Sequence, residues 1–327
     1  MRLLVTGGCG FIGSNFIRYV LEHYGQAKIT NVDSLTYAGN LANLAGVAES
    51  YGERYEFFHA DISDQTRMTA LFEKHQFFAV VNFAAESHVD RSIDTPGDFI
   101  HTNIVGTATL LDTSRRHGVR RFLQVSTDEV YGSLGPEGKF SETSPLQPSS
   151  PYSASKAGAD LLALATHHTY GQEVIITRCS NNYGPYQFPE KLIPLMIINA
   201  LSDKPLPVYG DGLNVRDWIH VEDHCAAIVA ALLEGRAGEV YNVGSDGEMR
   251  NIDVVRMILA HLGKPESLIQ YVTDRLGHDR RYAIDSSKAH RELHWKPQHR
   301  HEEGIRETID WYVANRAWWE PLMARPA

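Results

Sequence analysis

Short apolar segments alternate with longer amphipathic segments through the first half of the chain. The apolar segments have the length of buried strands and cover residues 3–5, 29–32, 55–59, 79–83, 121–125 and 174–177. The segments between them have helical periodicity, chiefly over residues 14–24, 64–74, 97–117 and 151–170. Strands alternating with helices at this spacing predict an α/β fold with a doubly wound parallel sheet. Ligands bind such a sheet beyond the carboxyl ends of its strands, so a site is expected there.

The first strand segment runs into a turn that contains Gly7, Gly10 and Gly13. Glycine permits a tight turn and a close backbone approach to a pyrophosphate, and the following helix offers free N–H groups at its start. Asp33 ends the second strand segment, about 20 residues further on, where an acid binds the adenosine ribose. A carboxylate there repels a 2′-phosphate. The pattern therefore predicts NAD, not NADP, as the cofactor.

Two later strand segments end in residues suited to the same cofactor. Asp61 and Ile62 follow the third segment, and the pattern places them beside the adenine. Ala84 and Ala85 follow the fourth, and their small side chains suit a close approach to the pyrophosphate and the nicotinamide ribose, although alanines are also common filler.

Titratable side chains follow the fifth strand segment and begin the next helix. Thr127 is followed by the adjacent acids Asp128 and Glu129, which form either a proton-handling site or a turn with two solvated carboxylates. Tyr152 and Lys156 lie four residues apart and so share a helix face. A nearby ammonium and a nicotinium would both lower the phenol pKa, which suits acid–base work during hydride transfer. Spacing alone does not separate this pair from a chance pair.

Charge and cysteine content narrow the class of protein. The net charge of −9 and the lack of a long basic run exclude nucleic acid and anionic membranes as partners. The three cysteines, Cys9, Cys179 and Cys225, give no disulfide framework and fit a reducing compartment, so we expect a cytoplasmic protein.

The length of 327 residues favours two domains. Residues 239–243 have the pattern of one more buried strand, which indicates that the chain returns to the first domain. We therefore expect an NAD-binding domain over 1–180 plus about 214–243. A smaller mixed α/β domain for the substrate is expected over about 181–213 plus 244–327.

The basic segments and the histidine pairs could each form a binding site or have only a structural or solvated role. Residues 274–282, together with Arg216, form either an anion pocket for a diphosphate or a solvated basic turn. His220 and His224 lie four apart, and His299 and His301 flank Arg300. Neither group has further ligands at zinc spacing, so no metal is expected.

These motifs together resemble one family. The glycine turn with Tyr152 and Lys156 resembles the extended short-chain dehydrogenase/reductases that act on nucleotide sugars, and residues 126–132 resemble the 4,6-dehydratases among them. Residues 84–92, 181–192, 207–210, 214–218 and 277–285 are similar to the dehydratases that act on dTDP-glucose. The chain departs from that pattern at Leu276, where proline is usual, and at residues 243–245.

The resemblance implies a set of binding residues and a homodimer. The dinucleotide site falls on Gly7, Gly10, Phe11, Ile12, Gly13, Asp33, Asp61, Ile62, Ala84, Ala85, Ser87, Thr102, Tyr152, Lys156 and Asn182. The sugar-nucleotide site falls on Ser87, Thr127, Asn181, Glu190, Lys191, Leu192, Pro207, Tyr209, Arg216, Asn251, Asp274 and His278. The dimer interface is expected on the helix after Ala84–Ala85 and on the Tyr152 helix.

The resemblance also implies a reaction of C4 oxidation, loss of water across C5 and C6, and reduction at C6. Tyr152 with Lys156 takes the O4 proton, Glu129 the C5 proton, Asp128 protonates the leaving hydroxyl, and Thr127 bonds the sugar at O4. A dehydratase for another nucleotide sugar, a 4-epimerase and a non-enzymatic NAD(H)-binding regulator are the alternatives. The Asp128–Glu129 pair argues against the epimerase, and the complete set of catalytic residues argues against the regulator.

Overall fold

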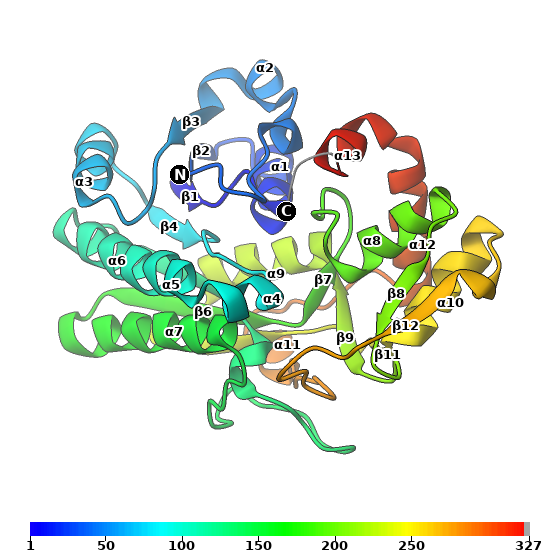
Figure 1. The fold of residues 1–327 in the computed structure, drawn as a ribbon. Helices are drawn as coiled ribbons and strands as arrows, with labels where there is room; N and C mark the ends of the chain where they lie inside the picture. Colours follow the sequence, from blue (N-terminus) through cyan, green and yellow to red (C-terminus); the bar gives the residue numbers. More distant parts are fainter. Residues whose placement is uncertain (324–327) are drawn as a thin grey trace.

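A seven-stranded parallel sheet forms the centre of the protein (Figure 1). The computed structural model describes residues 1–323. The strand order is β10-β6-β5-β4-β1-β2-β3, and each neighbouring pair is parallel. The strands are β1 (Arg2–Thr6), β2 (Lys28–Asp33), β3 (Tyr55–His59), β4 (Ala79–Asn82), β5 (Arg121–Thr127), β6 (Glu173–Cys179) and β10 (Val240–Val243). The predicted doubly wound sheet is confirmed.

Helices cover both faces of this sheet because its strands are apolar on both sides. Successive side chains point to opposite faces, so Leu3 belongs to the core under one layer of helices and Leu4 to the core under the other. One layer contains α1 (Phe11–His23) and α9 (Val221–Glu234). The other contains α3 (Gln65–Lys74), α6 (Thr107–Arg116) and α7 (Pro151–Tyr170), with α6 and α7 side by side in Figure 1. We call the sheet and these helices the main-sheet lobe.

The order of strands in the sheet reverses at β1. The chain moves outward from β1 to β2 and β3, and then crosses back to β4 on the other side of β1. The connections at the carboxyl ends of β1 and β4 therefore diverge, which opens a crevice at this edge of the sheet.

The second half of the chain builds a smaller lobe with its own core, seen on the right of Figure 1. One sheet contains β7 (Asn181–Tyr183), β9 (Val215–His220) and β11 (Glu248–Arg250), and another contains β8 (Leu206–Tyr209) and β12 (Ile269–Val272). The helices are α8 (Leu192–Leu201), α10 (Asn251–Leu262), α12 (His301–Ala314) and α13 (Arg316–Met323). We call this the small-sheet lobe.

The chain crosses between the two lobes more than once. From β9 in the small-sheet lobe it continues into α9 and β10, which belong to the main-sheet lobe. Later, α11 (Ser287–Glu292) packs against α9 and β10. The proposed division into two domains stays a prediction, and residues 324–327 of its second unit lie outside the described residues.

Two long helical segments, one of them the predicted 97–117 helix, are divided in the structure. The segment 97–117 is divided into α5 (Pro96–Phe99), the π-helix η3 (Ile100–Gly106) and α6. The segment 302–319 is broken at Asn315, whose side chain donates to the carbonyl of Trp311 over 2.8 Å. A side-chain amide that satisfies the last turn in this way ends α12 before α13 begins.

Shorter helical elements complete the fold. They are η1 (Leu41–Leu44), α2 (Val47–Tyr51), η2 (Gly52–Arg54), α4 (Val89–Asp94), η4 (Asp128–Tyr131) and η5 (Glu266–Leu268). Within residues 1–323, every helix is too short or too polar to cross a membrane.

Candidate active site

One cavity at the carboxyl ends of the main-sheet strands collects all the residues predicted for the dinucleotide. Its lining includes Gly7, Gly10, Phe11, Ile12, Gly13, Asp33, Asp61, Ile62, Ala84, Ala85, Ser87, Thr102, Tyr152, Lys156 and Asn182. The predicted catalytic residues Thr127, Asp128 and Glu129 line the same cavity. Segments from β1 to β6 therefore converge at the crevice that the strand order creates.

The glycine turn after β1 has a shape that only glycine allows. Gly7 has a positive φ of 67°, and a Cβ there would lie 2.7 Å from the backbone nitrogen of Ala84. A Cβ on Gly13 would lie 2.3 Å from the carbonyl oxygen of Gly7. Helix α1 starts at Phe11 without a side-chain cap, so its first N–H groups face the cavity unpaired by any cap. This cradle fits a pyrophosphate.

Asp33 is fixed at the end of β2 by backbone donors. Its Oδ2 accepts from the N–H of Cys9 and its Oδ1 from the N–H of Leu35, each over 2.8 Å. Burial raises the pKa of Asp33, and these two hydrogen bonds oppose the rise. The rigid carboxylate at this place fits the ribose role predicted for it.

The acidic turn η4 places Asp128 and Glu129 where β5 leaves the sheet. The Thr127 hydroxyl accepts from the N–H of Glu129 over 3.2 Å and donates to Oδ1 of Asp128 over 3.4 Å. Asp128 is only 1% exposed, and its Oδ2 has no hydrogen-bond partner among the described residues. Burial, with smaller contributions from Glu129 and Asp217, holds the pKa of Asp128 well above its usual range. A raised pKa favours the protonated form of this carboxyl, which suits the acid role predicted for Asp128.

Glu129 has different electrostatic surroundings. Burial raises its pKa, but Arg275, Arg216 and Lys191 act in the opposite direction. Two neighbouring acids in unequal environments favour opposite protonation states, the arrangement that separates an acid from a base.

Helix α7 carries Tyr152 and Lys156 in its first two turns. A reciprocal capping box of Ser150 and Ser153 starts the helix, with Pro151 at its first position. Burial, followed by the charge of Glu129, raises the pKa of Tyr152 well above its usual range. The Lys156 ammonium donates to the carbonyl of Val125 over 2.7 Å. The lowered phenol pKa that the sequence predicted is thus not found in the protein alone, where burial dominates the pKa of Tyr152.

The residues predicted for the sugar nucleotide divide into two groups. Ser87, Thr127, Asn181, Glu190 and Lys191 line the cavity, and Lys191 donates to the carbonyl of Ser87 over 3.0 Å. The others lie outside this lining, in the small-sheet lobe and its loops, and are Leu192, Pro207, Tyr209, Arg216, Asn251, Asp274 and His278.

Contacts among the second group form around the 274–278 segment. Asp274 and His278 form an ion pair of 2.5 Å, and the His278 ring lies 6.2 Å from the ring of Tyr209. Arg216 is buried and donates to the carbonyl of Asp279 over 2.9 Å. Because Arg216 also affects the pKa of Glu129, this group lies within electrostatic range of the acidic turn.

Several cavity residues were missed by the sequence analysis. Thr36 and Tyr37 follow Asp33 in a loop, Glu86 interrupts the predicted Ala84–Ser87 set, and Phe188 comes from the loop before α8. The guanidinium carbon of Arg91 lies over the Tyr37 ring, 4.0 Å from the ring centre. No periodicity or motif marks these loop residues, and only the fold brings them to the cavity.

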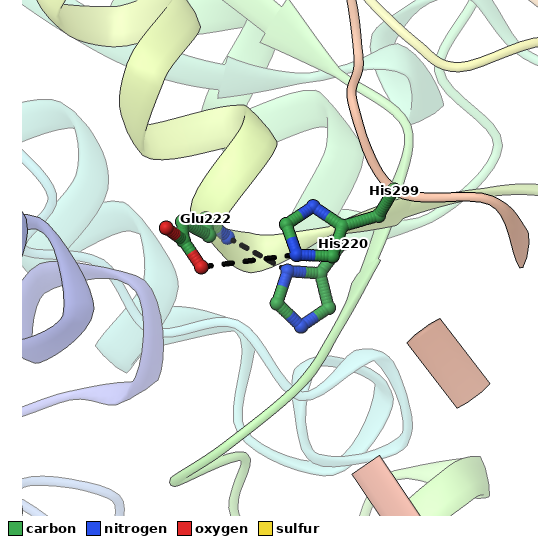
Figure 2. A group of neighbouring side chains, drawn as sticks. All are labelled: His220, Glu222 and His299. Carbon is green, nitrogen blue, oxygen red and sulfur yellow. Dashed lines mark hydrogen bonds and ion pairs between the residues drawn. The ribbon is translucent and has the colours of Figure 1, made fainter. Parts of the chain in front are cut away.

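The structure brings together two histidines that the sequence analysis treated separately (Figure 2). His220, Glu222 and His299 could each offer one metal ligand. The two rings stack with centroids 3.9 Å apart and planes 26° apart, so their in-plane lone pairs do not converge. Nδ1 of His220 also accepts from the N–H of Glu222 over 3.3 Å. This donor set does not fit a metal ion without rearrangement, and the absence of a metal stays a prediction.

Comparisons with known proteins agree with this geometry. A family profile described as GDP-mannose 4,6 dehydratase matches residues 4–308. A dTDP-glucose 4,6-dehydratase from Xanthomonas campestris is 56% identical, with 96% of this chain and 94% of that protein covered. The dTDP-glucose 4,6-dehydratase structure from Streptomyces venezuelae, with NAD and dTDP bound, has a TM-score of 0.95 at 51% identity and covers 98% of this chain and 100% of that chain. The Bacillus anthracis enzyme in complex with NAD has a TM-score of 0.92 at 52% identity, with 98% and 99% covered.

Fold and site define an extended short-chain dehydrogenase/reductase that uses NAD on a nucleotide sugar. Within that class, the chain belongs to the dTDP-glucose 4,6-dehydratase family of NAD-dependent hydro-lyases.

Proposed function

We propose that this chain converts dTDP-glucose to dTDP-4-dehydro-6-deoxyglucose and water, with separate tasks for the residues around the cavity. The observation that carries the proposal is one cavity lined by the dinucleotide cradle, by Tyr152 with Lys156, and by Thr127, Asp128 and Glu129. When bound, NAD supplies the hydride acceptor for C4 and returns the hydride to C6.

Tyr152 takes the O4 proton in its phenolate form, and Lys156 stabilises that phenolate with its positive charge before the transfer. Burial makes this phenolate costly, and a bound oxidised nicotinamide would add positive charge in the same cavity and lower that cost. Thr127 bonds O4 and polarises the C4 carbonyl, which makes the C5 proton acidic.

Glu129 then removes the C5 proton and Asp128 protonates the departing C6 hydroxyl. The buried Asp128, with its unpartnered Oδ2, supports the acid role, and the cationic surroundings of Glu129 support the base role. Glu129 finally returns the proton to C5. The cavity residues Ser87, Asn181, Glu190 and Lys191 hold the sugar in this scheme, and the small-sheet lobe holds the nucleotide with Leu192, Pro207, Tyr209, Arg216, Asn251, Asp274 and His278.

Mass spectrometry of the sugar nucleotide after incubation with dTDP-glucose tests the proposal. The expected product has lost one water. An unchanged substrate mass would refute the dehydratase activity, and a product of unchanged mass but altered C4 configuration would favour the 4-epimerase. Competition among dTDP-, UDP-, CDP- and GDP-glucose tests the base preference.

We also infer a homodimer through the helices beside α7. Ile93 on α4, Ile100 and Val105 on η3, and Leu161 on α7 are exposed, and these helices contact one another. Exposed apolar side chains gathered on adjacent helices suit an interface. Leu161→Glu should give a monomer in size-exclusion chromatography with light scattering, whereas Leu233→Glu, on the exposed side of α9, should not change the mass.

The cysteines support a cytoplasmic location. Cys9, Cys179 and Cys225 are all free and buried, as expected in a reducing compartment.

A further inference from the structure

A fully buried ion pair lies behind the cavity without lining it. Nε of Arg178 on β6 lies 2.9 Å from Oδ2 of Asp160 on α7, and their side chains are 3% and 0% exposed. Neither residue belongs to the cavity lining, so neither can touch a bound cofactor or sugar. Buried ion pairs are often no more stabilising than apolar residues of similar volume. A gain in stability alone is therefore a weak reason for this pair.

The pair joins the two segments that carry the proton-handling groups. Asp160 lies one helical turn beyond Lys156, on the same face of α7. Arg178 has a second partner, because its Nη1 donates to the Tyr131 hydroxyl over 3.0 Å. Tyr131 is the last residue of η4, the turn that contains Asp128 and Glu129. The Tyr131 hydroxyl in turn donates to Oδ1 of Asn242 on β10 over 2.8 Å.

Lys156 depends on this arrangement for a countercharge. Lys156 is 4% exposed, and its ammonium donates to one neutral acceptor, the Val125 carbonyl. Within residues 1–323, no carboxylate forms an ion pair with it. The titratable groups that act on its charge are Asp160 on α7 and Cys179 on β6, and Tyr152 lies one turn before it on the same face of α7. Burial lowers the pKa of Lys156, and Asp160 is the strongest influence against that lowering. Burial raises the pKa of Asp128 well above its usual range, which makes it a weaker source of negative charge than an ordinary carboxylate.

We propose that Asp160 is a positioning residue for the reaction: it supplies the negative charge that keeps Lys156 cationic, and through Arg178 and Tyr131 it fixes the turn that carries Asp128 and Glu129. One buried carboxylate thereby links the O4 base to the C5 base and the C6 acid. This inference rests on the proposed function, since it assigns Asp160 a part in that reaction.

Asp160→Asn tests the proposal, because asparagine keeps the shape and removes the charge. The pH dependence of kcat and KM is measured with dTDP-glucose, with the hydride step followed by the absorbance of reduced nicotinamide. We expect kcat to fall by up to about 100-fold, as for a misplaced catalytic group. KM should stay nearly unchanged because the residue lies outside the cavity. The alkaline limb of the kcat profile should move to lower pH, because Lys156 loses its proton more easily without the countercharge.

Two further variants separate this role from a structural one. Asp160→Asn with Arg178→Gln removes both charges and leaves no lone ion buried, so it should fold even where the single variant does not. The alkaline limb of its kcat profile should move to lower pH by less than in the single variant, because the loss of the Arg178 cation offsets part of the loss of the Asp160 charge. Tyr131→Phe keeps the ring and removes only the hydroxyl, and it should lower kcat without moving the limb.

The inference would be overturned if the alkaline limb of the kcat profile coincided with that of the wild type in the charge-removing variant that folds. This holds even if kcat itself fell. The wild-type product analysis keeps the two ideas apart. Wild-type protein that releases no water from dTDP-glucose would refute the proposed function. An active wild type with unshifted variants would refute only the role of Asp160.

Discussion

In the main-sheet lobe, functional residues follow neighbouring parallel strands, and the hydrogen-bond register of one sheet sets their places. In the small-sheet lobe, the residues proposed for the nucleotide come from two short sheets, the starts of α8 and α10, and the 274–278 segment. The residues predicted for the dinucleotide all line a single cavity, whereas the residues proposed for the nucleotide of the substrate all lie outside its lining. A site built on one continuous sheet is pre-formed, but a site built on separate loops depends on how those loops are held.

The two lobes meet electrostatically at Glu129. Arg275 and Arg216 of the small-sheet lobe, with Lys191, lower the pKa of this main-sheet carboxylate against the effect of burial. Arg275 also lies 3.8 Å from Asp90 on α4, across the junction between the lobes. The small-sheet lobe thus has a second part in the proposed scheme besides nucleotide binding, because its cations favour the ionised form of the proposed base.

The largest effect is expected from Glu129→Gln, which removes the proposed base and leaves the dinucleotide cradle intact. Overall turnover should fall on the order of 10²- to 10⁴-fold, the usual contribution of a positioned general base. Reduced nicotinamide should still form when dTDP-glucose is added, because oxidation at C4 precedes the step that Glu129 performs. Asp128→Asn is the matched comparison at the neighbouring position. A Glu129→Gln enzyme that releases water at the normal rate would show that the base lies elsewhere.

Gly7→Ala should disrupt the dinucleotide cradle of the main-sheet lobe, which is the pre-formed site. The new Cβ would lie 2.7–2.9 Å from backbone atoms of Phe83 and Ala84, at a φ that alanine rarely adopts. The backbone conformation alone should cost about 1–3 kcal/mol in the free energy of unfolding. Affinity for NAD, measured by calorimetry, should fall as well. The control is Gly25→Ala, where a Cβ meets no atom within 4 Å and the change should stay within about 0.5 kcal/mol. Equal effects at both glycines would contradict the cradle.

The contrast between the lobes also explains what the sequence could predict. Apolar segments such as 79–83 are strands because both faces of the sheet are covered, and the residues after such strands must meet at one edge. This logic placed Asp33, Ala84 and Thr127 around one cavity. It has no equivalent for Tyr37 in its loop. Nor does it reveal that Asp160 pairs with Arg178, because such pairs arise only from three-dimensional packing.

Arg275→Gln should show how far the small-sheet lobe controls the chemistry. Without this cation the pKa of Glu129 rises further, so the acidic limb of the kcat profile should move to higher pH. The sign follows from the role of Glu129 as a base, which must be ionised to act. Arg280→Gln is the control in the same segment, since Arg280 is exposed and pairs with Asp211 over 2.8 Å. An acidic limb that moves equally in both variants would indicate a general charge effect.

The smallest effect is expected at the stacked rings of His220 and His299, which Figure 2 shows. The pKa of His299 is raised, chiefly by its bond to Asp223, whose carboxylate lies 3.1 Å from Nδ1. A raised pKa means that the folded state binds this proton more tightly than the unfolded state. The stabilisation is therefore complete below the unfolded pKa of about 6.5 and is lost as pH rises through the higher folded value. His299→Gln should lower the free energy of unfolding by no more than about 1 kcal/mol, as for partly exposed pairs. The difference from wild type should shrink from pH 5.5 to pH 8.5, about one to two units either side of the unfolded value. The control is His168→Gln, at an exposed position on α7, which should show no such trend in denaturant unfolding. If the loss of stability in His299→Gln does not vary with pH, the stacking of His299 on His220 stabilises this site and the proton does not.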